Sequence, residues 1–282
     1  MISADVILDS LSPDNHRLTT MRVRCPRFIW DEVLTHRAFS RNASSLRAVP
    51  TKRLIEDVKA QLAEPVEWSK NKPGMIGGDL MDLTGTSAAQ DVWRAAAQFA
   101  IMEAGSLAAM GVHKQIANRL LMPFAHINGL ITATEWDNFF TLRRHWAADP
   151  TVAALAEALW TAQQASTPNL LRPGQWHLPF VRDQDWNTLT DDYKPFRTMI
   201  QISVARCARI SYQSNATGKD STTTEDLILA AKLLNSQPMH ASPAEHQATP
   251  DQWDEEDHIW RDGDRHGNFK GWVQYRKTLA MD

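Results

Sequence analysis

Hydrophobic and polar positions along the chain follow two different periods, and these periods predict its elements. Residues 17–29 alternate loosely and end at a proline, which predicts an edge strand because proline cannot donate to a sheet ladder. Elsewhere apolar side chains recur at helical spacing. That spacing predicts helices over 28–37, 51–63, 86–111, 113–124, 131–146, 149–165 and 222–237. Residues 198–212 are apolar and end in a β-compatible run, and residues 38–50, 64–85 and 166–197 are expected to be loops.

Several of these helices carry start and stop signals. Thr51 and Asp149 are expected caps, Pro150 suits a first turn, and one of three threonines at 222–224 caps the last helix. Gly111 and Pro123 are expected to end two others. Helix therefore dominates, with few strands, and a chain of 282 residues suits one large domain or two small ones.

Composition excludes some classes of protein. A net charge of −3 gives no global electrostatic case for nucleic acid, so any anion site must be a local patch. The N-terminus lacks the pattern of a signal peptide, and no apolar run approaches the roughly 18 residues that a membrane span needs. Two distant cysteines, Cys25 and Cys207, form no disulfide framework. We therefore expect a cytoplasmic protein that binds neither nucleic acid nor membrane.

The motifs of several common enzyme classes are missing from the sequence. The ten histidines do not form a metal motif, neither cysteine lies in a nucleophile motif, and no glycine-rich phosphate loop is present. A nucleotide phosphate would then have to be bound by side chains, and arginine suits this best. Residues 36–47, HRAFSRNASSLR, hold three arginines and a histidine without any acidic residue, which indicates an anion site.

Two further residues and one segment allow two interpretations each. Arg119 and Arg143 lie in mostly apolar helices, where each either extends to water or faces a polar pocket. The segment MHASPAEH (239–246) is either a helix start capped by Ser242 or a cluster of polar groups around a turn.

Taken together, these segments resemble the flavin-dependent thymidylate synthases, the ThyX family. The family's RHR motif and its following loop correspond to Thr35, His36 and Arg37, then Ser40, Asn42, Ser45 and Arg47. ANRLLMPF matches its A-R-x-x-L-P segment through Arg119, and TATEWDNFFTLR matches another through Asn138 and Arg143. ARCARISY and the segment ending MHASPAEH resemble a block that comes first in typical members. Here that block lies at 204–246, so the resemblance implies a circular permutation.

The resemblance implies a fold and a reaction. The fold would be α+β and ThyX-like, mainly helical with a small antiparallel sheet. Residues 1–282 would form one domain with loop insertions at 64–85 and 166–197 and a C-terminal tail at 250–282. The enzyme would be a methyltransferase that moves a one-carbon unit from 5,10-methylenetetrahydrofolate to C5 of dUMP, with FAD and NADPH as cofactors. As in the family, it would be a homotetramer with sites shared between subunits, and the chain would be a phage-like member.

The resemblance also assigns roles to residues. Arg143, Ser45 and His240 would be catalytic, with Arg143 contacting the pyrimidine. The substrate would be bound by Arg47, Ser45, Arg119, Arg143 and Glu32. The flavin would be bound by His36, Arg37, Asn42, Asn138, His240 and Ser242. No metal is expected.

Departures from the family pattern leave alternatives open. Thr35 replaces the first arginine of RHR, Glu32 a glutamine, Ala43 an acidic residue and Ala48 an aromatic one. Glu32 accepts hydrogen bonds only, which would favour the 4-amino group of cytosine. A methylase or hydroxymethylase of dUMP or dCMP for modified phage DNA is therefore an alternative, as is an inactive family member. Gln274 and Arg276 of the tail allow two interpretations. They either replace the hydrogen-bond donors that these departures remove, or they belong to an amphipathic C-terminal segment that packs on the rest of the protein. A helical nucleic-acid-binding protein using the basic run 37–53 is a further alternative, which the overall acidity disfavours.

Overall fold

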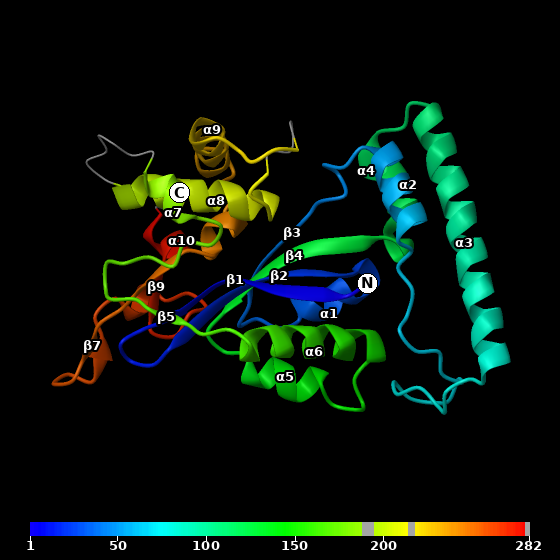
Figure 1. The fold of residues 1–282 in the computed structure, drawn as a ribbon, viewed down its shortest axis with the longest axis horizontal. Helices are drawn as coiled ribbons and strands as arrows, with labels where there is room; N and C mark the ends of the chain where they lie inside the picture. Colours follow the sequence, from blue (N-terminus) through cyan, green and yellow to red (C-terminus); the bar gives the residue numbers. More distant parts are fainter. Residues whose placement is uncertain (188–194, 214–217, 280–282) are drawn as a thin grey trace.

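A five-stranded sheet organises the chain, in a computed structural model that describes residues 1–187, 195–213 and 218–279. The strand order is β3 (Ser40–Ala43), β4 (His126–Ala133), β2 (Arg17–Pro26), β1 (Ser3–Leu11) and β5 (Asn169–Leu170). Figure 1 shows this sheet between two groups of helices. All neighbouring strands pair antiparallel except β1 and β5, which are parallel. The predicted α+β class, mainly helical with a small sheet, is confirmed.

One face of the sheet is covered by three helices. Met21, Val23 and Cys25 alternate along β2 and pack with β4 against α1 (Trp30–Leu34), α5 (Asp137–Arg143) and α6 (Pro150–Gln164). α1 follows a single turn of 3-10 helix, η1 (Arg27–Ile29). Trp30 lies so close to Gly129 of β4 that a Cβ there would come within 2.4 Å of its ring. This close approach seats α1 on the sheet.

The C-terminal part of the chain covers one end of the other face. It contains α7 (Asp183–Trp186), α8 (Pro195–Arg209), α9 (Thr223–Leu234), the 3-10 helix η3 (Ser242–Glu245) and α10 (Tyr275–Thr278). Two small ribbons, β6 (Ala248–Pro250) with β9 (Trp272–Gln274) and β7 (Trp253–Asp254) with β8 (Ile259–Trp260), and a short turn, η4 (Gly263–Arg265), complete it. Leu130 of β4 packs here against Phe180, Cys207 and Ile210.

A buried chain of hydrogen bonds fastens this C-terminal part to the sheet. His177 bonds Ser10 through Nδ1 and Thr20 through Nε2, both at 2.8 Å. Thr20 bonds Thr132 at 2.7 Å, and Thr132 bonds Nδ1 of His246 at 2.8 Å. All five side chains are at most 1% exposed, and burial holds the pKa of each histidine at about 3. Both imidazoles are therefore neutral links between strands β1, β2 and β4 and the C-terminal segment.

These buried histidines predict a loss of stability in acid. An unfolded histidine takes up a proton near pH 6.5, so between about pH 6.5 and 3 these two histidines carry two more protons in the unfolded chain than in the folded one. The free energy of unfolding should then fall by roughly 1.4 kcal/mol per pH unit for each histidine. Urea unfolding at a series of pH values measures the slope. His246→Asn should reduce it, whereas replacement of the exposed His258 by Asn should leave it unchanged; equal slopes in both variants would contradict the prediction.

A third group of helices stands beside the sheet. α2 (Thr51–Ala60), the 27-residue α3 (Leu83–Ala109), α4 (Lys114–Ala117) and the 3-10 helix η2 (Asn118–Phe124) share a small core around Leu54, Val58 and Leu121. α3 forms the outer edge of the molecule (Figure 1). None of the helices in the described ranges has the length and apolar character to span a membrane.

Several predicted elements differ from those observed. β2 ends at Pro26 as predicted, but it lies inside the sheet, where the proline occupies only its last position. Residues 40–43 form an edge strand instead of a loop, because β4 offers them a partner. The predicted helix at 131–146 begins only at Asp137, and Ile131–Ala133 complete β4. Residues 198–209 belong to helix α8, although they are rich in residues that also suit strands.

Other boundaries agree closely with prediction. α6 is capped by Asp149 with Pro150 in its first turn, and α9 is capped by Thr222 through a capping box with Glu225.

Two expected helix signals act differently from prediction. Thr51 is the first residue of α2 and forms no cap, and Pro123 lies inside η2 instead of ending it. Parts of the predicted loop 166–197 and of the tail, residues 188–194 and 280–282, lie outside the described residues.

Candidate functional site

Arg143 at the end of α5 lies at the centre of a polar cluster beneath the sheet. Its Nη1 donates to the carboxylate of Glu32 on α1 at 2.7 Å, and its Nε donates to Nε2 of His36 at 3.1 Å. Nη2 lies 3.4 Å from the hydroxyl of Thr35. Three predicted site residues therefore meet in the folded chain: Glu32, His36 and Arg143. The fold thus joins two segments that are more than a hundred positions apart in the sequence.

His36 is held neutral in this cluster. Its ring is 9% exposed and packs against Phe39 and Phe139. Burial, then the positive charges of Arg143 and Arg41, lowers its pKa. Because Nε2 accepts from Arg143, the proton of the neutral ring lies on Nδ1. Glu32 and Arg143 are 38% and 21% exposed, so the guanidinium remains within reach of a small ligand.

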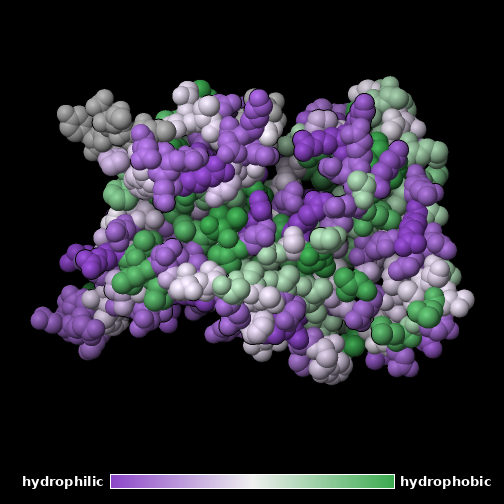
Figure 2. Space-filling view, viewed as in Figure 1, coloured by the Kyte–Doolittle hydropathy of each residue, from purple (hydrophilic) through white to green (hydrophobic). Residues whose placement is uncertain are grey.

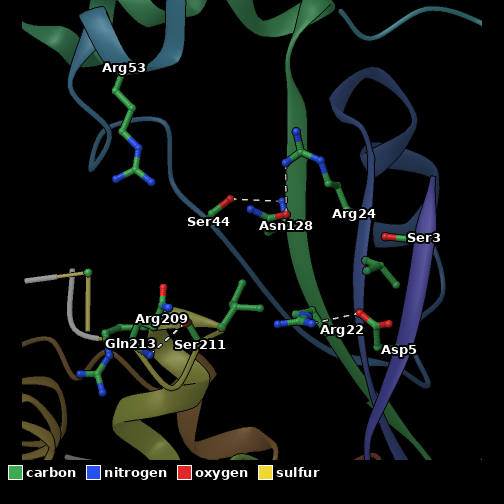
Figure 3. Close-up of a pocket in the computed structure, with 13 residues that line it drawn as sticks. Ser3, Asp5, Arg22, Arg24, Ser44, Arg53, Asn128, Arg209, Ser211 and Gln213 are labelled. Atoms are coloured by element: carbon green, nitrogen blue, oxygen red, sulfur yellow. Dashed lines mark hydrogen bonds and ion pairs between the residues drawn. The ribbon is translucent and has the colours of Figure 1, made fainter. Parts of the chain in front are cut away.

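A second polar site lies on the opposite face of the sheet. Arg22 and Arg24 alternate with the buried residues of β2 and therefore point away from the Arg143 cluster. They line a cavity of about 620 Å³, together with Asn128 of β4, Arg53 of α2 and Ser44, and with Ser211 and Gln213, which follow α8. Figure 3 shows Arg53 entering from above and Arg22 pointing toward the Ser211 side. Figure 2 shows the molecule hollowed between α8 and α2, with hydrophilic residues around the hollow.

The charges of this cavity, which we call the basic pocket, favour an anion. Arg22 is paired with Asp5 at 3.1 Å. Arg24 instead donates to the amide oxygens of Gln61 and Asn128, at 3.0 and 3.4 Å, so these neutral partners do not offset its charge. Arg53 adds a further guanidinium. Guanidinium groups and hydroxyls are the donors that bind phosphate oxygens.

The loop between β3 and α2 carries two other predicted residues. The amide of Asn118, which is fully buried, donates to the carbonyl groups of Leu46 and Val49 at 2.8 and 3.0 Å. These bonds fix the loop that exposes Ser45 and Arg47, next to η2 and Arg119. Arg119 is exposed as well, so within this chain it extends to water, the first of the two interpretations that its sequence allows.

The C-terminal blocks of the sequence meet strand β3. The side chain of Asn42 donates to the carbonyl of Cys207 at 2.8 Å. Gln274 of the tail is buried, and it donates to the hydroxyl of Ser40 at 3.0 Å and to the carbonyl of Glu245 at 2.9 Å. Cys207 of segment 204–212 therefore contacts β3 directly, and Gln274 links segment 242–245 to the same strand. His240 and Ser242 are exposed here, and Ser242 begins the short 3-10 helix without capping it.

The remaining predicted residues lie elsewhere. Arg37 is exposed beside the cluster, and Asn138 lines a separate cavity of about 420 Å³ with His16 and Lys270. Within one chain the predicted residues therefore do not form a single site: Glu32, His36 and Arg143 meet, and the others lie apart from them. Sequence reasoning missed Arg22, Arg24, Arg53 and Asn128, although the alternation of MRVRC already pointed both arginines of β2 to one face.

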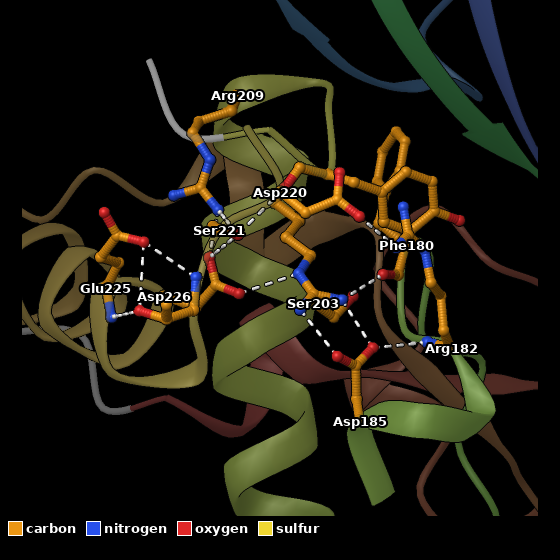
Figure 4. A network of polar contacts seen from close by, with 12 residues as sticks. Phe180, Arg182, Asp185, Ser203, Arg209, Asp220, Ser221, Glu225 and Asp226 are labelled. Carbon is orange, nitrogen blue, oxygen red and sulfur yellow. Dashed lines mark hydrogen bonds and ion pairs between the residues drawn. The ribbon is translucent and has the colours of Figure 1, made fainter. Parts of the chain in front are cut away.

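A buried ion network positions the end of α8 beside the basic pocket (Figure 4). Arg206 donates both Nη atoms to Asp185, at 2.6 and 2.8 Å, and its Nε to Asp226 at 2.8 Å. Asp226 also accepts from Arg209 and from Ser221. The network joins α7, α8 and α9, and so fixes where Ser211 enters the pocket.

Two other expectations concern chemistry. Both cysteines are buried, and burial raises the pKa of Cys25 to about 12, so neither is suited to attack a substrate. Among the described residues no group of histidine, cysteine and carboxylate side chains could hold a metal ion.

Comparisons with known proteins give a family. Two solved structures of the UMP/dUMP methylase PolB from Streptomyces cacaoi, bound with 5-Br UMP and with 5-Br dUMP, are each 19% identical to this chain and cover 58% of it. The similarity spans 88% and 90% of those chains, with TM-scores of 0.47 and 0.43. No curated protein matches. The family model described as thymidylate synthase complementing protein matches residues 7–169. This match covers more than half of the chain, which therefore belongs to the thymidylate synthase complementing protein family, the flavin-dependent thymidylate synthases.

Proposed function

We propose that this protein transfers a one-carbon unit from 5,10-methylenetetrahydrofolate to C5 of a pyrimidine deoxynucleotide, with dUMP as substrate and dTMP as product. The observation that carries the proposal is the Arg143 cluster in a chain of this family. A guanidinium fixed by Glu32 and His36 is preorganised to stabilise negative charge on a pyrimidine carbonyl. This electrostatic role needs no enzyme nucleophile, in agreement with the two buried cysteines.

The donor set of the basic pocket fits the phosphate groups of a nucleotide or of FAD. Arg24 and Arg53 supply charge, and Ser44, Ser211 and Asn128 supply hydroxyl and amide donors. When bound, reduced FAD would supply the hydride and NADPH would restore the reduced flavin. Of the family positions, we assign flavin binding to His36, Arg37, Asn42, Asn138, His240 and Ser242. Substrate binding is assigned to Ser45, Arg47, Arg119 and Arg143, and catalytic roles to Arg143, Ser45 and His240.

The separation of these residues favours a site shared between copies. Ser45, Arg47 and Arg119 are exposed beside η2, whereas Arg143 lies under the sheet on α5. A second copy of the chain could supply one of these groups to a nucleotide that the other group contacts. We therefore propose a homotetramer in which one subunit supplies the loop at 45–47 and another supplies Arg143. The contacts of segments 204–212 and 242–245 with β3 support the proposed circular permutation.

A second candidate substrate follows from Glu32. Its carboxylate accepts hydrogen bonds only, and it stands where the family resemblance places a glutamine. The 4-amino group of cytosine would donate to it, whereas uracil offers an oxygen at that position. A methylase or hydroxymethylase acting on dCMP is therefore the alternative that this residue favours.

Flavin absorbance tests the proposal first. The purified protein is expected to be yellow, or to become so with added FAD, and to keep the absorbance after desalting. dUMP and dCMP, and their ribose forms, would then be offered with 5,10-methylenetetrahydrofolate and NADPH, and the products weighed by mass spectrometry. A methyl gain on dUMP is expected. A product only from cytosine would favour the second candidate, and a protein that binds no FAD would refute the flavin reaction.

A further inference from the structure

The side chain of Arg27, where β2 passes into α1, has polar atoms without a partner. Its Nε and Nη1 are shielded from solvent, and neither forms a hydrogen bond with any residue that the structure describes. No carboxylate of the described residues pairs with it, although Asp31, four residues later, acts on its charge. A guanidinium is always charged in proteins, and an unpaired charge away from water is costly. Arg27 therefore lacks the counter-charge that such a group normally has.

Packing on both sides holds the backbone around Arg27. Its backbone N–H donates to the carbonyl of Ala125 at 2.9 Å, which ties η1 to the end of η2. The ring of Phe28 packs edge-on against Trp93 of α3, with 5.9 Å between the ring centroids. Trp30, on the other side, is 6% exposed. The side chain of Arg27 therefore projects from a fixed position.

A cavity of about 300 Å³, which we call the Arg27 cavity, opens beside this side chain between η1, α1 and η2. Its lining has four apolar and two charged residues: Arg27, Phe28, Trp30, Asp31, Met122 and Pro123. The third guanidinium nitrogen of Arg27, Nη2, is not shielded as the other two are, so the positive charge meets the cavity at this atom. The volume is at the lower end of the range for small-molecule sites.

Partial burial makes this charge more attractive to an anion. Burial lowers the pKa of the Arg27 guanidinium, and the carboxylate of Asp31 offsets this only in part. An anion beside Nη2 would replace the hydration that the guanidinium has lost. Because the local dielectric constant is lower than that of water, the attraction is also stronger than at a fully solvated arginine.

We propose that the Arg27 cavity binds a small organic monocarboxylate with an apolar, ring-shaped body. The carboxylate accepts a charge-assisted hydrogen bond from Nη2 of Arg27 and supplies the missing counter-charge. The body packs against Phe28, Trp30 and Met122, where the aromatic side chains offer both contact area and ring edges. No residue lines both this cavity and the basic pocket.

The charge of Asp31 decides between kinds of anion. Its exposed carboxylate lines the same cavity, so a ligand there meets one positive and one negative group. The cost of taking an ion out of water rises more steeply with its charge than its attraction to a single cation does. A phosphate dianion is therefore disfavoured in this mainly apolar cavity. The basic pocket, where several arginines and hydroxyls converge, has the opposite preference.

Fluorine NMR with 4-fluorobenzoate tests the proposal on the wild-type protein. Its signal should broaden on titration and give a dissociation constant of about 1 mM or lower, the range of a ligand of about ten non-hydrogen atoms. The neutral 4-fluorobenzyl alcohol should bind about ten-fold more weakly, because it cannot form the charged pair. Inorganic phosphate should not displace the carboxylate. Failure of 4-fluorobenzoate to bind, equal binding of the alcohol, or displacement by phosphate would each refute the proposal.

Two matched arginine variants locate the binding. Arg27→Met removes the charge and keeps much of the side-chain volume, so it should weaken the binding of 4-fluorobenzoate by about ten-fold or more. Arg24→Met, three residues earlier, removes a charge from the basic pocket and should leave this binding unchanged. The reverse result would place the carboxylate in the basic pocket and exclude the Arg27 cavity.

Thermal unfolding separates a binding role of Arg27 from a structural one. Arg27→Met should melt at or above the wild-type temperature, because it removes a partly desolvated charge without breaking an ion pair. 4-Fluorobenzoate should raise the melting temperature of the wild type and not that of the variant. A variant that melts lower would show that Arg27 supports the fold, and would contradict the proposed site. None of these measurements uses flavin or product, so they are independent of the proposed reaction.

Discussion

Replacement of Arg143 by methionine is expected to lower kcat by about 100- to 1,000-fold, the usual loss when one preorganised electrostatic donor is removed. Methionine keeps much of the side-chain volume but leaves no positive charge where the pyrimidine carbonyl would gain electrons. Glu32 and His36 would lose their hydrogen bonds to the guanidinium at the same time. Turnover of nucleotide by the purified, flavin-loaded variant measures the effect.

The adjacent Arg144 provides a matched control. It pairs with Glu157 at 2.7 Å and lies over the ring of Trp160, away from the cluster. Arg144→Met should leave kcat within a few-fold of the wild-type value. Similar activity of both variants would contradict the assignment of Arg143, provided that each variant unfolds at the wild-type temperature.

Asp226→Ala should cause a large loss of stability, about 3–5 kcal/mol, because it breaks a buried ion pair and leaves Arg206 and Arg209 without one of their carboxylates. Asp226 is fully buried at the junction of α8 and α9. For a chain of this size the melting temperature should fall by roughly 6–15 °C. Calorimetry or circular dichroism measures the shift.

Asp220 lies in the same region and makes a surface pair with Arg182, its side chain 58% exposed. Exposed pairs contribute about 0–1 kcal/mol, so Asp220→Ala should shift the melting temperature by about 2 °C or less. Equal losses in the two variants would show that burial of the network does not determine its strength.

The sequence predicts well wherever local signals decide the structure. The capping residues Asp149 and Thr222 place two helix starts within a residue, since a side chain that accepts backbone N–H groups acts locally. The apolar period also finds α3. β3 and β4 were missed because their short segments become strands only through pairing with distant chain, for example Ser40 with Thr132.

The same contrast between local signals and contacts of distant segments applies to the candidate site. Glu32, His36 and Arg143 follow from motif resemblance, and the fold brings them within hydrogen-bonding distance. The basic pocket was not predicted, because Arg53 reaches it from α2 and Asn128 from β4, and no local pattern links these elements. Arg119 shows a further limit, since its apolar helix left open whether it faces water or a pocket, and only the fold shows it exposed.

The buried chain of hydroxyls and imidazoles has a consequence for synthesis on the ribosome. Thr20 emerges 157 residues before its partner His177, and Thr132 emerges 114 residues before His246. Until then Thr20 and Thr132 have only each other as partners in this buried chain, and contacts so distant along the sequence form slowly. One face of the sheet in the segment that matches the family model therefore stays uncovered until the residues after 169, which lie outside that match, have been made.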